Sequence, residues 1–229
     1  MMLEKYQLHR VILDTIQERG FLRTCQMMTA FIRDLVFDFR YKTDTFSWVD
    51  LNDLTIESGN IERGTDYVPT KAAPFRRLMH SLDIPSDSVF VDFGSGKGKL
   101  LLLATKHEFS RIVGVEFSRD LCDISQNNVL RLKNVLSGVE RIEIFNVDAA
   151  EYSFRDDENV LYFFNPFDEH VMQVVLQNFF DSLKRRPRDI WLIYNNPVHR
   201  NLIENQSLMK VIGEYRLGGN DFLVYSNHV

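Results

Sequence analysis

The sequence predicts an α/β fold: a doubly wound, mostly parallel seven-stranded sheet with an antiparallel terminal hairpin, plus N-terminal helices. From residue 69 onward, short apolar runs rich in Val, Ile, Phe and Tyr alternate with longer runs of helical period. Alternating strands and helices form parallel βα units, with helices on both faces of the sheet. The last two apolar runs are separated only by Gly218, Gly219 and Asn220, which predicts a tight turn between antiparallel strands.

The N-terminal part of the chain is expected to be helical and then irregular. Apolar residues recur at helical spacing over 3–19, and Gly20 follows as a helix C-cap. A second helix is expected from Leu22 to Phe39. Residues 41–66 are rich in Asp, Thr, Asn and Gly, so an ordered wrap or a mobile lid is expected there. The expected domains are an N-terminal helical cap and lid segment over 1–66 and an α/β domain over 67–229.

The α/β region opens with a helix over 72–82, which ends before Pro85. The strands are expected at 89–93, 111–116, 142–145, 160–164, 189–195, 211–217 and 221–226. The helices between them are expected at 99–106, 119–135, 169–183 and 200–206. In such a sheet, ligands bind at the carboxyl ends of the strands, near the point where the strand order reverses.

Composition narrows the range of functions. The 229 residues are 45 % hydrophobic, enough for a sizeable core, and the net charge of −5 argues against a general nucleic-acid binder. The short basic run over 184–188 is interpreted as solvated surface. The N-terminus lacks the continuous apolar stretch of a signal peptide, and no run approaches the roughly 20 apolar residues of a membrane span. A cytoplasmic protein without membrane insertion is therefore expected, and its oligomeric state stays open.

The cysteines and histidines do not form a metal-binding pattern. Cys25 and Cys122 lie far apart and outside CxxC spacing, so they are expected to be buried thiols in a reducing compartment. The sequence contains no HxH motif and no Cys/His/Asp cluster, so no metal is expected.

The stretch VDFGSGKGK (91–99) carries the strongest functional signal. It follows a strand and opens a helix, so Gly94, Ser95, Gly96 and Gly98 are expected in a tight loop that a ligand can approach closely. The stretch fails the phosphate-loop pattern GxxxxGK[ST] and is one residue shorter than the dinucleotide pattern GxGxxG. Asp92 would repel a pyrophosphate but favour a ligand that carries an ammonium and a sulfonium charge. S-adenosylmethionine (SAM) is such a ligand.

Acidic residues also end the next two strands. Glu116 could accept hydrogen bonds from both hydroxyls of a ribose, which suits NAD as well as SAM, or it could be a surface acid. Asp148 could accept from an adenine amino group while the amide of Ala149 donates to a ring nitrogen. Alternatively, Asp148 caps a helix.

The motifs VDFGSGKGK, GVEF, NVDAA and FFNPF, in this order, resemble the class I SAM-dependent methyltransferases. The resemblance covers about residues 66–229 and implies a Rossmann-like fold with a reversed last strand, in which 67–229 form the SAM-binding methyltransferase domain. It implies SAM as the cofactor and S-adenosylhomocysteine as its product. The implied contacts are Asp92 and Gly94–Gly98 with the methionine part, Glu116 at the ribose, and Asp148 with Ala149 at the adenine. Phe117 is also expected at the cofactor.

A finer similarity is to the non-SET lysine methyltransferases of this fold and to uncharacterised bacterial methyltransferases of the same layout. The similar places are Tyr67-Val68-Pro69-Thr70, the DFGSGKG loop and Asn165-Pro166-Phe167. The similarity implies that Tyr67 and Thr70 reach over the methionine end of the cofactor. The histone-directed enzymes have a doubled Asn where this chain has Phe164-Asn165, and this chain has no long basic tail. The acceptor therefore stays open between a protein lysine and a small-molecule amine.

The Asn-Pro-Phe phrase follows the expected fourth strand, where the methyl acceptor should lie. The Asn165 side chain and the carbonyl beside Pro166 could orient an amine as it loses its proton, with Phe167 as an aromatic wall. Asn165 is also expected at the cofactor. The alternative is that Pro166 merely ends the strand and Asn165 forms a turn. Asp168, Glu169 or His170 could act as a base, or Asp168 could cap the next helix.

A second Asn-Pro phrase, YNNPVH (194–199), ends the next strand and is expected to line the same rim. Two rival functions stay open at this point. One is an NAD-dependent oxidoreductase on a related sheet, against which the glycine spacing and Asp92 both argue. The other is a non-catalytic nucleotide-binding domain.

Overall fold

A computed structural model describes residues 20–47, 49 and 68–228. The helix expected over 3–19, Tyr67, most of the expected lid and the expected domain boundary at 66/67 lie outside these residues. The chain divides into two compact units, Met1–Lys42 and Thr43–Val229. Within the first unit, helix α2 spans Phe21–Tyr41, which confirms the helix expected over 22–39. It ends at Lys42, whose φ of 54° is left-handed.

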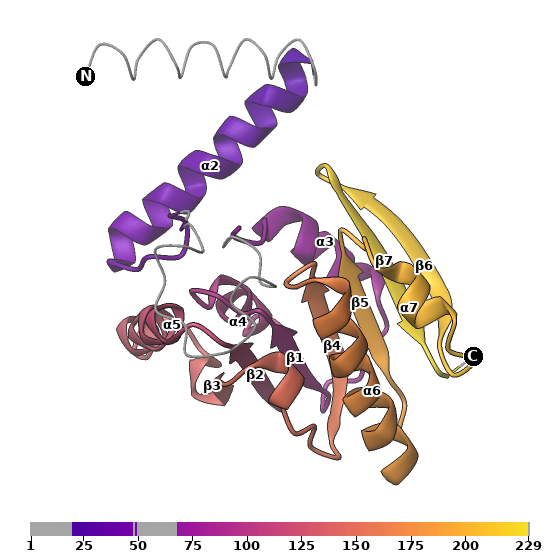
Figure 1. The fold of residues 1–229 in the computed structure, drawn as a ribbon. Helices are drawn as coiled ribbons and strands as arrows, with labels where there is room; N and C mark the ends of the chain where they lie inside the picture. The colour runs from indigo at the N-terminus through magenta and orange to yellow at the C-terminus, as the bar shows by residue number, and fades with distance from the viewer. Residues whose placement is uncertain (1–19, 48, 50–67, 229) are drawn as a thin grey trace. The chain divides into compact units, whose positions relative to one another are not determined.

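The second unit is built on one seven-stranded sheet in the order β3-β2-β1-β4-β5-β7-β6 (Figure 1). The strands are β1 (Val89–Phe93), β2 (Arg111–Glu116), β3 (Ile142–Asn146), β4 (Glu158–Phe164), β5 (Trp191–Asn195), β6 (Lys210–Leu217) and β7 (Asn220–Ser226). Strands β1 to β5 pair in parallel, and β7 lies antiparallel between β5 and β6. This arrangement confirms the expected doubly wound sheet with an antiparallel terminal hairpin.

Helices cover both faces of the sheet. They are α3 (Ala72–Ser81), α4 (Lys99–Ala104), α5 (Arg119–Leu132), α6 (Glu169–Arg185) and α7 (Arg200–Glu204), with short 3-10 helices η3 (Val139–Arg141) and η4 (Ala149–Glu151). Alternate residues of each strand point to opposite faces. One face packs against α6 and α7, and the other packs against α3 and α4. None of the described helices is both long and apolar enough to cross a membrane.

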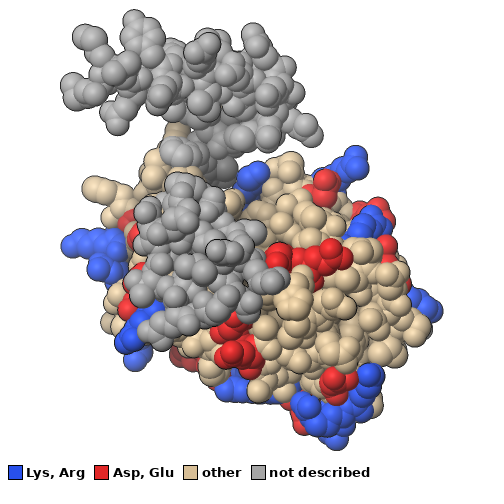
Figure 2. Space-filling model, in the orientation of Figure 1, with Lys and Arg blue, Asp and Glu red and all other residues tan. Residues whose placement is uncertain are grey.

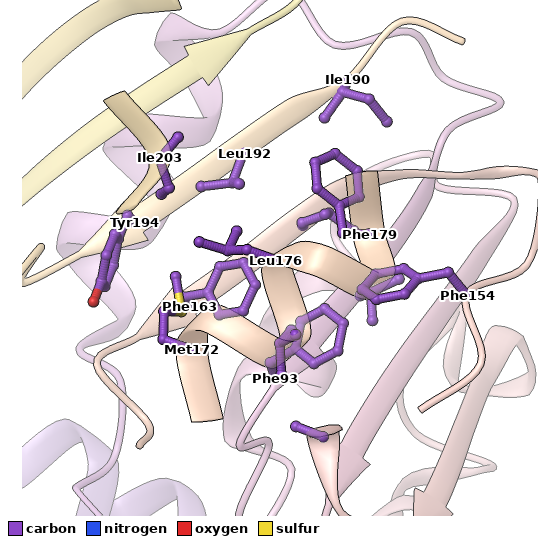
Figure 3. Close-up of a cluster of buried hydrophobic side chains, with 14 of the residues drawn as sticks. Phe93, Phe154, Phe163, Met172, Leu176, Phe179, Ile190, Leu192, Tyr194 and Ile203 are labelled. Atoms are coloured by element: carbon purple, nitrogen blue, oxygen red, sulfur yellow. The ribbon is translucent and has the colours of Figure 1, made fainter. Parts of the chain in front are cut away.

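The core under α6 contains many aromatic side chains. Phe93 of β1 and Phe163 of β4 stack with their ring centroids 4.9 Å apart. Figure 3 shows them facing Met172 and Leu176 of α6, with Tyr194 of β5 at the margin of the cluster. The hydroxyl of Tyr194 points away from the other labelled side chains. This core therefore fixes the ends of β1, β4 and β5, from which the site is built.

The terminal hairpin turns through Gly218 and Gly219, whose φ angles are 59° and 80°. Two consecutive residues with positive φ are what a two-residue hairpin turn of this hand requires, so glycine is favoured at both positions. Asn220 was expected in the turn but is the first residue of β7, paired with Leu217.

Other sequence expectations were also wrong in detail, among them the start of β5, which was expected at 189 and lies at Trp191. Strand β4 begins at Glu158, two residues earlier than expected, because the fully buried Glu158 carboxylate accepts hydrogen bonds from the Tyr152 hydroxyl (2.6 Å) and the Arg155 amide (3.0 Å). A polarity pattern cannot detect a carboxylate whose partners lie elsewhere in the chain. Cys122 is buried as expected, and burial raises the pKa of its thiol to about 12. Cys25, on α2, is exposed.

Candidate functional site

The glycine loop lies at the carboxyl end of β1 and leads into α4. Gly94, Gly96 and Gly98 all have positive φ, at 76°, 53° and 77°. The amides of Gly94 and Ser95 both donate to the carbonyl of Val115 on β2, at 2.9 and 3.1 Å. The loop is therefore anchored to the neighbouring strand through its backbone. Its positive φ angles are ones that residues with a Cβ rarely adopt.

The Asn-Pro-Phe loop touches the glycine loop. A Cβ built on Gly94 would lie 2.5 Å from Cβ of Pro166, much closer than real carbon contacts allow. Only glycine lets the two loops approach this closely. The structure thus brings together two motifs that are 72 positions apart in sequence, at the carboxyl ends of the adjacent strands β1 and β4.

Asp92 is a buried carboxyl group two residues before the loop, with 4 % of its surface exposed. Burial raises its pKa well above the usual value for an aspartate, and the nearby Glu116 carboxylate raises it further. A cationic ligand group beside Asp92 would have the opposite effect and favour its ionised form. The position therefore suits an ammonium ligand, as the sequence predicts.

Glu116, at the end of β2, binds the glycine loop itself. One carboxylate oxygen accepts from the Gly96 amide at 2.8 Å and the other from the Ser118 amide at 2.9 Å. Burial raises the pKa of Glu116, and these backbone hydrogen bonds partly oppose that rise. Each carboxylate oxygen still has a lone pair for a ribose hydroxyl. Phe117, the next residue, is half-buried, and its carbonyl accepts from Asn146 at 3.0 Å.

Asp148 performs the capping role that the sequence left open. One of its carboxylate oxygens accepts from the Ala150 amide at 2.9 Å, at the start of η4. Ala149 is buried and packs in the core under α6. Contact of Asp148 and Ala149 with an adenine stays a prediction.

Both Asn-Pro phrases place an asparagine in the left-handed region before proline. The φ angles are 42° at Asn165 and 52° at Asn196. Left-handed backbone is uncommon outside glycine, and proline further restricts the residue that precedes it. The two phrases meet through Tyr194, whose hydroxyl donates to Oδ1 of Asn165 at 3.4 Å and accepts from the His199 amide at 3.3 Å. The expectation that they share one rim is confirmed.

The residues that follow Asn165 have structural partners. Phe167 is 8 % exposed and packs edge-on against Phe163, with ring centroids 6.3 Å apart. Asp168 caps α6 by accepting from the Val171 amide at 3.0 Å. Glu169 and His170 are exposed on the first turn of that helix. Phe167 therefore belongs largely to the core, and its role as a wall for the acceptor stays a prediction.

Thr70 lies in a buried polar group at the same edge of the sheet. It is 7 % exposed and shares a side-chain hydrogen bond with Tyr162 of β4. The Tyr162 hydroxyl also accepts from the Asn195 side chain at 3.1 Å. Burial and the charge of Asp92 raise the pKa of Tyr162. Thr70 thus bonds to the tyrosine on which the charge of Asp92 acts, and its contact with the cofactor stays a prediction.

Four residues near the loop were not recognised from the sequence as a group. Lys97, in the middle of the glycine loop, is 1 % exposed and forms an ion pair with Asp44 at 2.8 Å. Its ammonium also donates to Ser47. Asn128 of α5 bonds to the backbones of both Asp44 and Lys97. A lysine inside a glycine loop was the one available signal, because such a buried charge needs a partner.

The site fits SAM better than it fits a metal ion. It contains a loop that glycine alone can form, a buried carboxyl group, and the buried hydroxyl of Ser95, which has no hydrogen-bond partner among the described residues. A buried polar atom without a partner commonly marks a ligand position. Within residues 20–47, 49 and 68–228, no group of three or more His, Cys, Asp or Glu side chains could hold a metal ion.

Comparison with known sequences agrees with this geometry. The family model of the histone methylation protein DOT1 matches residues 65–191, more than half of the chain. A protein-lysine N-methyltransferase from Saccharolobus islandicus (strain REY15A) is 29 % identical over 91 residues, which are 37 % of this chain and 54 % of that protein. The match thus spans about half the length of this curated relative.

Solved structures share the fold at low sequence identity. An RNA methyltransferase from Salinibacter ruber, in complex with S-adenosylhomocysteine, has a TM-score of 0.54 at 18 % identity, covering 69 % of this chain and 93 % of its own. A SAM-dependent methyltransferase from Aquifex aeolicus has a TM-score of 0.51 at 13 % identity, covering 67 % and 88 %. These likenesses confirm the Rossmann-like methyltransferase fold. The family match over residues 65–191 shows that the chain belongs to the histone methylation protein DOT1 family.

Proposed function

We propose that this protein is a SAM-dependent methyltransferase that transfers a methyl group to a nitrogen acceptor, a lysine side chain of a protein. The observation that carries the proposal is the contact between Gly94 and Pro166. This contact joins the glycine loop, which would bind the cofactor, to the Asn-Pro-Phe loop, which would receive the acceptor. The lysine acceptor is supported by the family and by the curated relative of that activity.

The cofactor would be held by the residues around the glycine loop. Asp92 would bind the ammonium group, and Thr70, Ser95 and the loop backbone would surround the methionine part. Glu116 and Asp148 would contact the ribose and the adenine. When bound, SAM supplies a methyl group that its sulfonium sulfur already activates toward a nucleophile. The protein's contribution is then mainly alignment of the acceptor and exclusion of water.

Asn165 would position the acceptor. A lysine amine has a pKa near about 10.4, so it must lose a proton before its lone pair can react. The backbone carbonyl and the side-chain oxygen of Asn165 can accept the remaining N–H groups and thereby aim the lone pair. The hydroxyl of Tyr194 donates to the same side-chain oxygen, which fixes the orientation of the amide. Asp168 caps α6 by accepting from the Val171 amide, and in this proposal the proton of the amine passes to water.

The surface is consistent with a cationic acceptor. Figure 2 shows Lys and Arg side chains mostly around the margin of the face in view, with groups of Asp and Glu nearer its middle. The net charge of the chain is −5, and a negatively charged protein attracts a positively charged peptide and repels the phosphates of nucleic acid. This charge distribution favours a protein acceptor over RNA or DNA.

The decisive experiment has two stages. Calorimetry with SAM, S-adenosylhomocysteine and NAD comes first, and we expect the first two to bind and NAD not to bind. Tritiated methyl transfer from SAM into an extract of the source cells follows, with the extract fractionated into protein, nucleic acid and small molecules. Label recovered as methyllysine after acid hydrolysis of the protein fraction supports the proposal.

The matched variant for transfer is Asn165→Ala, which should transfer little label even at SAM concentrations that saturate it. Absence of SAM binding by the wild-type protein would overturn the whole proposal. Label confined to small molecules or to nucleic acid would overturn the lysine acceptor while leaving the methyltransferase activity intact. NAD binding in place of SAM would favour an oxidoreductase.

A further inference from the structure

The segment 43–47 lies directly against the glycine loop. Lys97 extends from the loop and donates to both carboxylate oxygens of Asp44, at 2.9 and 2.8 Å, and to the hydroxyl of Ser47. The lysine is almost completely buried, whereas 47 % of the Asp44 side chain is exposed. The two partners are 53 positions apart in sequence, so this contact brings a distant part of the chain to the loop.

A second set of contacts joins the same two stretches of backbone. Asn128, on α5, is 2 % exposed. Its amide nitrogen donates to the carbonyls of Asp44 (2.8 Å) and Lys97 (3.0 Å), and its oxygen accepts from the Asp44 amide (2.9 Å). One buried side chain therefore satisfies backbone groups of both the segment and the loop. Such a fully bonded buried amide tolerates little displacement of either partner.

Aromatic and small polar residues complete the contact. The ammonium of Lys99, which begins α4, lies over the ring of Phe46 at 5.4 Å from its centroid. Thr43 and Thr45 are both buried. Every residue of the segment from Thr43 to Ser47 thus either is buried or contacts a residue of the glycine loop or the start of α4.

We propose that residues 43–47 are a functional part of the cofactor site, in which the Lys97–Asp44 pair couples docking of the segment to SAM binding and favours SAM over S-adenosylhomocysteine. This inference rests on the proposed function. Two physical effects support it. The first effect is conformational entropy. The segment 43–47 holds the glycine loop, and the backbone of that loop would hold the cofactor, so docking of the segment lowers the entropy cost of ordering the loop around SAM. The second effect is electrostatic, because SAM and S-adenosylhomocysteine differ in net charge.

SAM carries a sulfonium, an ammonium and a carboxylate, so its net charge is positive, whereas S-adenosylhomocysteine lacks the sulfonium charge and is neutral overall. A lysine in the cofactor loop disfavours a positive ligand, and the carboxylate of Asp44 offsets that effect. Removing the Asp44 charge should therefore weaken SAM more than S-adenosylhomocysteine. If the pair were only structural, loss of the Asp44 charge would weaken the binding of both ligands equally.

The test measures dissociation constants of both ligands, at low ionic strength, for four proteins: wild type, Asp44→Asn, Lys97→Met and the double variant. We expect Asp44→Asn to weaken the binding of SAM about 5- to 20-fold and the binding of S-adenosylhomocysteine about 3-fold or less. Lys97→Met should shift the ratio of the two constants the other way. The double variant carries neither charge and should return the ratio to within about 2-fold of wild type. Asp181→Asn, which breaks the exposed pair with Lys184, is the control and should change neither constant.

Hydrogen exchange of the Asp44 amide, which donates to Asn128, tests the coupling without any substitution. We expect saturating SAM to slow this exchange in the wild-type protein at least 5-fold, more than S-adenosylhomocysteine does. An unchanged ligand ratio across the four proteins, or an exchange rate that SAM leaves unaltered, would overturn the inference. A wild-type protein that binds neither ligand would instead overturn the proposed function, so the two failures are distinguishable.

Discussion

The hydroxyl of Tyr194, on β5, donates a hydrogen bond of 3.4 Å to Oδ1 of Asn165, the residue that follows β4. The same hydroxyl accepts from the His199 amide, so Tyr194 connects the two Asn-Pro phrases. Tyr194 is otherwise enclosed in the core and packs against Phe163, with ring centroids 6.1 Å apart. A rigid side chain thus determines which way the Asn165 amide faces.

Replacing Tyr194 with Phe should therefore impair turnover more than cofactor binding. The variant keeps the ring in the core but leaves the Asn165 oxygen and the His199 amide without this partner. We expect kcat to fall about 10-fold while the dissociation constant of SAM changes less than about 3-fold, with a stability loss of about 1 kcal/mol. Steady-state kinetics and calorimetry measure both quantities. Tyr225→Phe is the matched control, because Tyr225 is also buried but bonds to Glu204 on α7.

Asn165 itself offers a pair of variants that separate backbone from side chain. Its φ of 42° is tolerated by glycine and asparagine but costly for alanine, so Asn165→Gly should be more stable than Asn165→Ala by about 1 kcal/mol. Both variants lack the amide, and both should lose about 100-fold or more in kcat if the side chain positions the acceptor. Thermal melts and turnover assays check this prediction. Activity retained by Asn165→Gly alone would mean that only the backbone conformation matters.

Gly94→Ala tests the contact between the two loops. The new methyl group would overlap Pro166, and the φ of 76° is strained for alanine. We expect a loss of roughly 2–4 kcal/mol in stability and at least 10-fold weaker SAM binding. Gly20→Ala is the control, since its φ of 81° is also positive but no atom of the described residues lies within 4 Å of the new Cβ. That variant should bind SAM as the wild type does.

Asp92→Asn should stabilise the free protein near neutral pH while weakening SAM binding. The pKa of Asp92 is raised in the folded state, so the folded protein binds this proton more tightly than the unfolded chain does. Stability associated with Asp92 is therefore present at low pH and is lost as pH rises from the unfolded pKa, near 3.8, through the higher folded value. Asparagine cannot ionise and avoids this loss, a gain of roughly 1–3 kcal/mol at pH 7.

Denaturant unfolding of both proteins between pH 3.5 and pH 8 measures the Asp92 effect. The stability advantage of Asp92→Asn should be large at pH 7–8 and should shrink as the solution is acidified. An advantage that grows on acidification would mean that Asp92 is ionised and well stabilised in the free protein. Calorimetry on the same two proteins at pH 7 checks that the more stable variant is the weaker binder.

The local pattern of apolar and polar residues was enough to predict much of the fold. The alternation of apolar runs and helical runs predicted all seven strands, because strand period and helix period are properties of neighbouring residues. The glycine spacing with Asp92 predicted the kind of loop at the end of β1. Glu158 was missed as a strand residue, since its buried charge is satisfied by Tyr152 and Arg155 and not by its neighbours in the strand.

The sequence by itself determined the order of the elements, the glycine loop and the family motifs that locate the site. Only the tertiary structure decided what those motifs touch. It placed Pro166 against Gly94, joined Asn165 to Tyr194, and paired Lys97 with Asp44 across 53 positions of sequence. These contacts depend on strand order and on where distant segments return to the sheet. Neither is encoded in local periodicity, so no pattern within a short window could have predicted them.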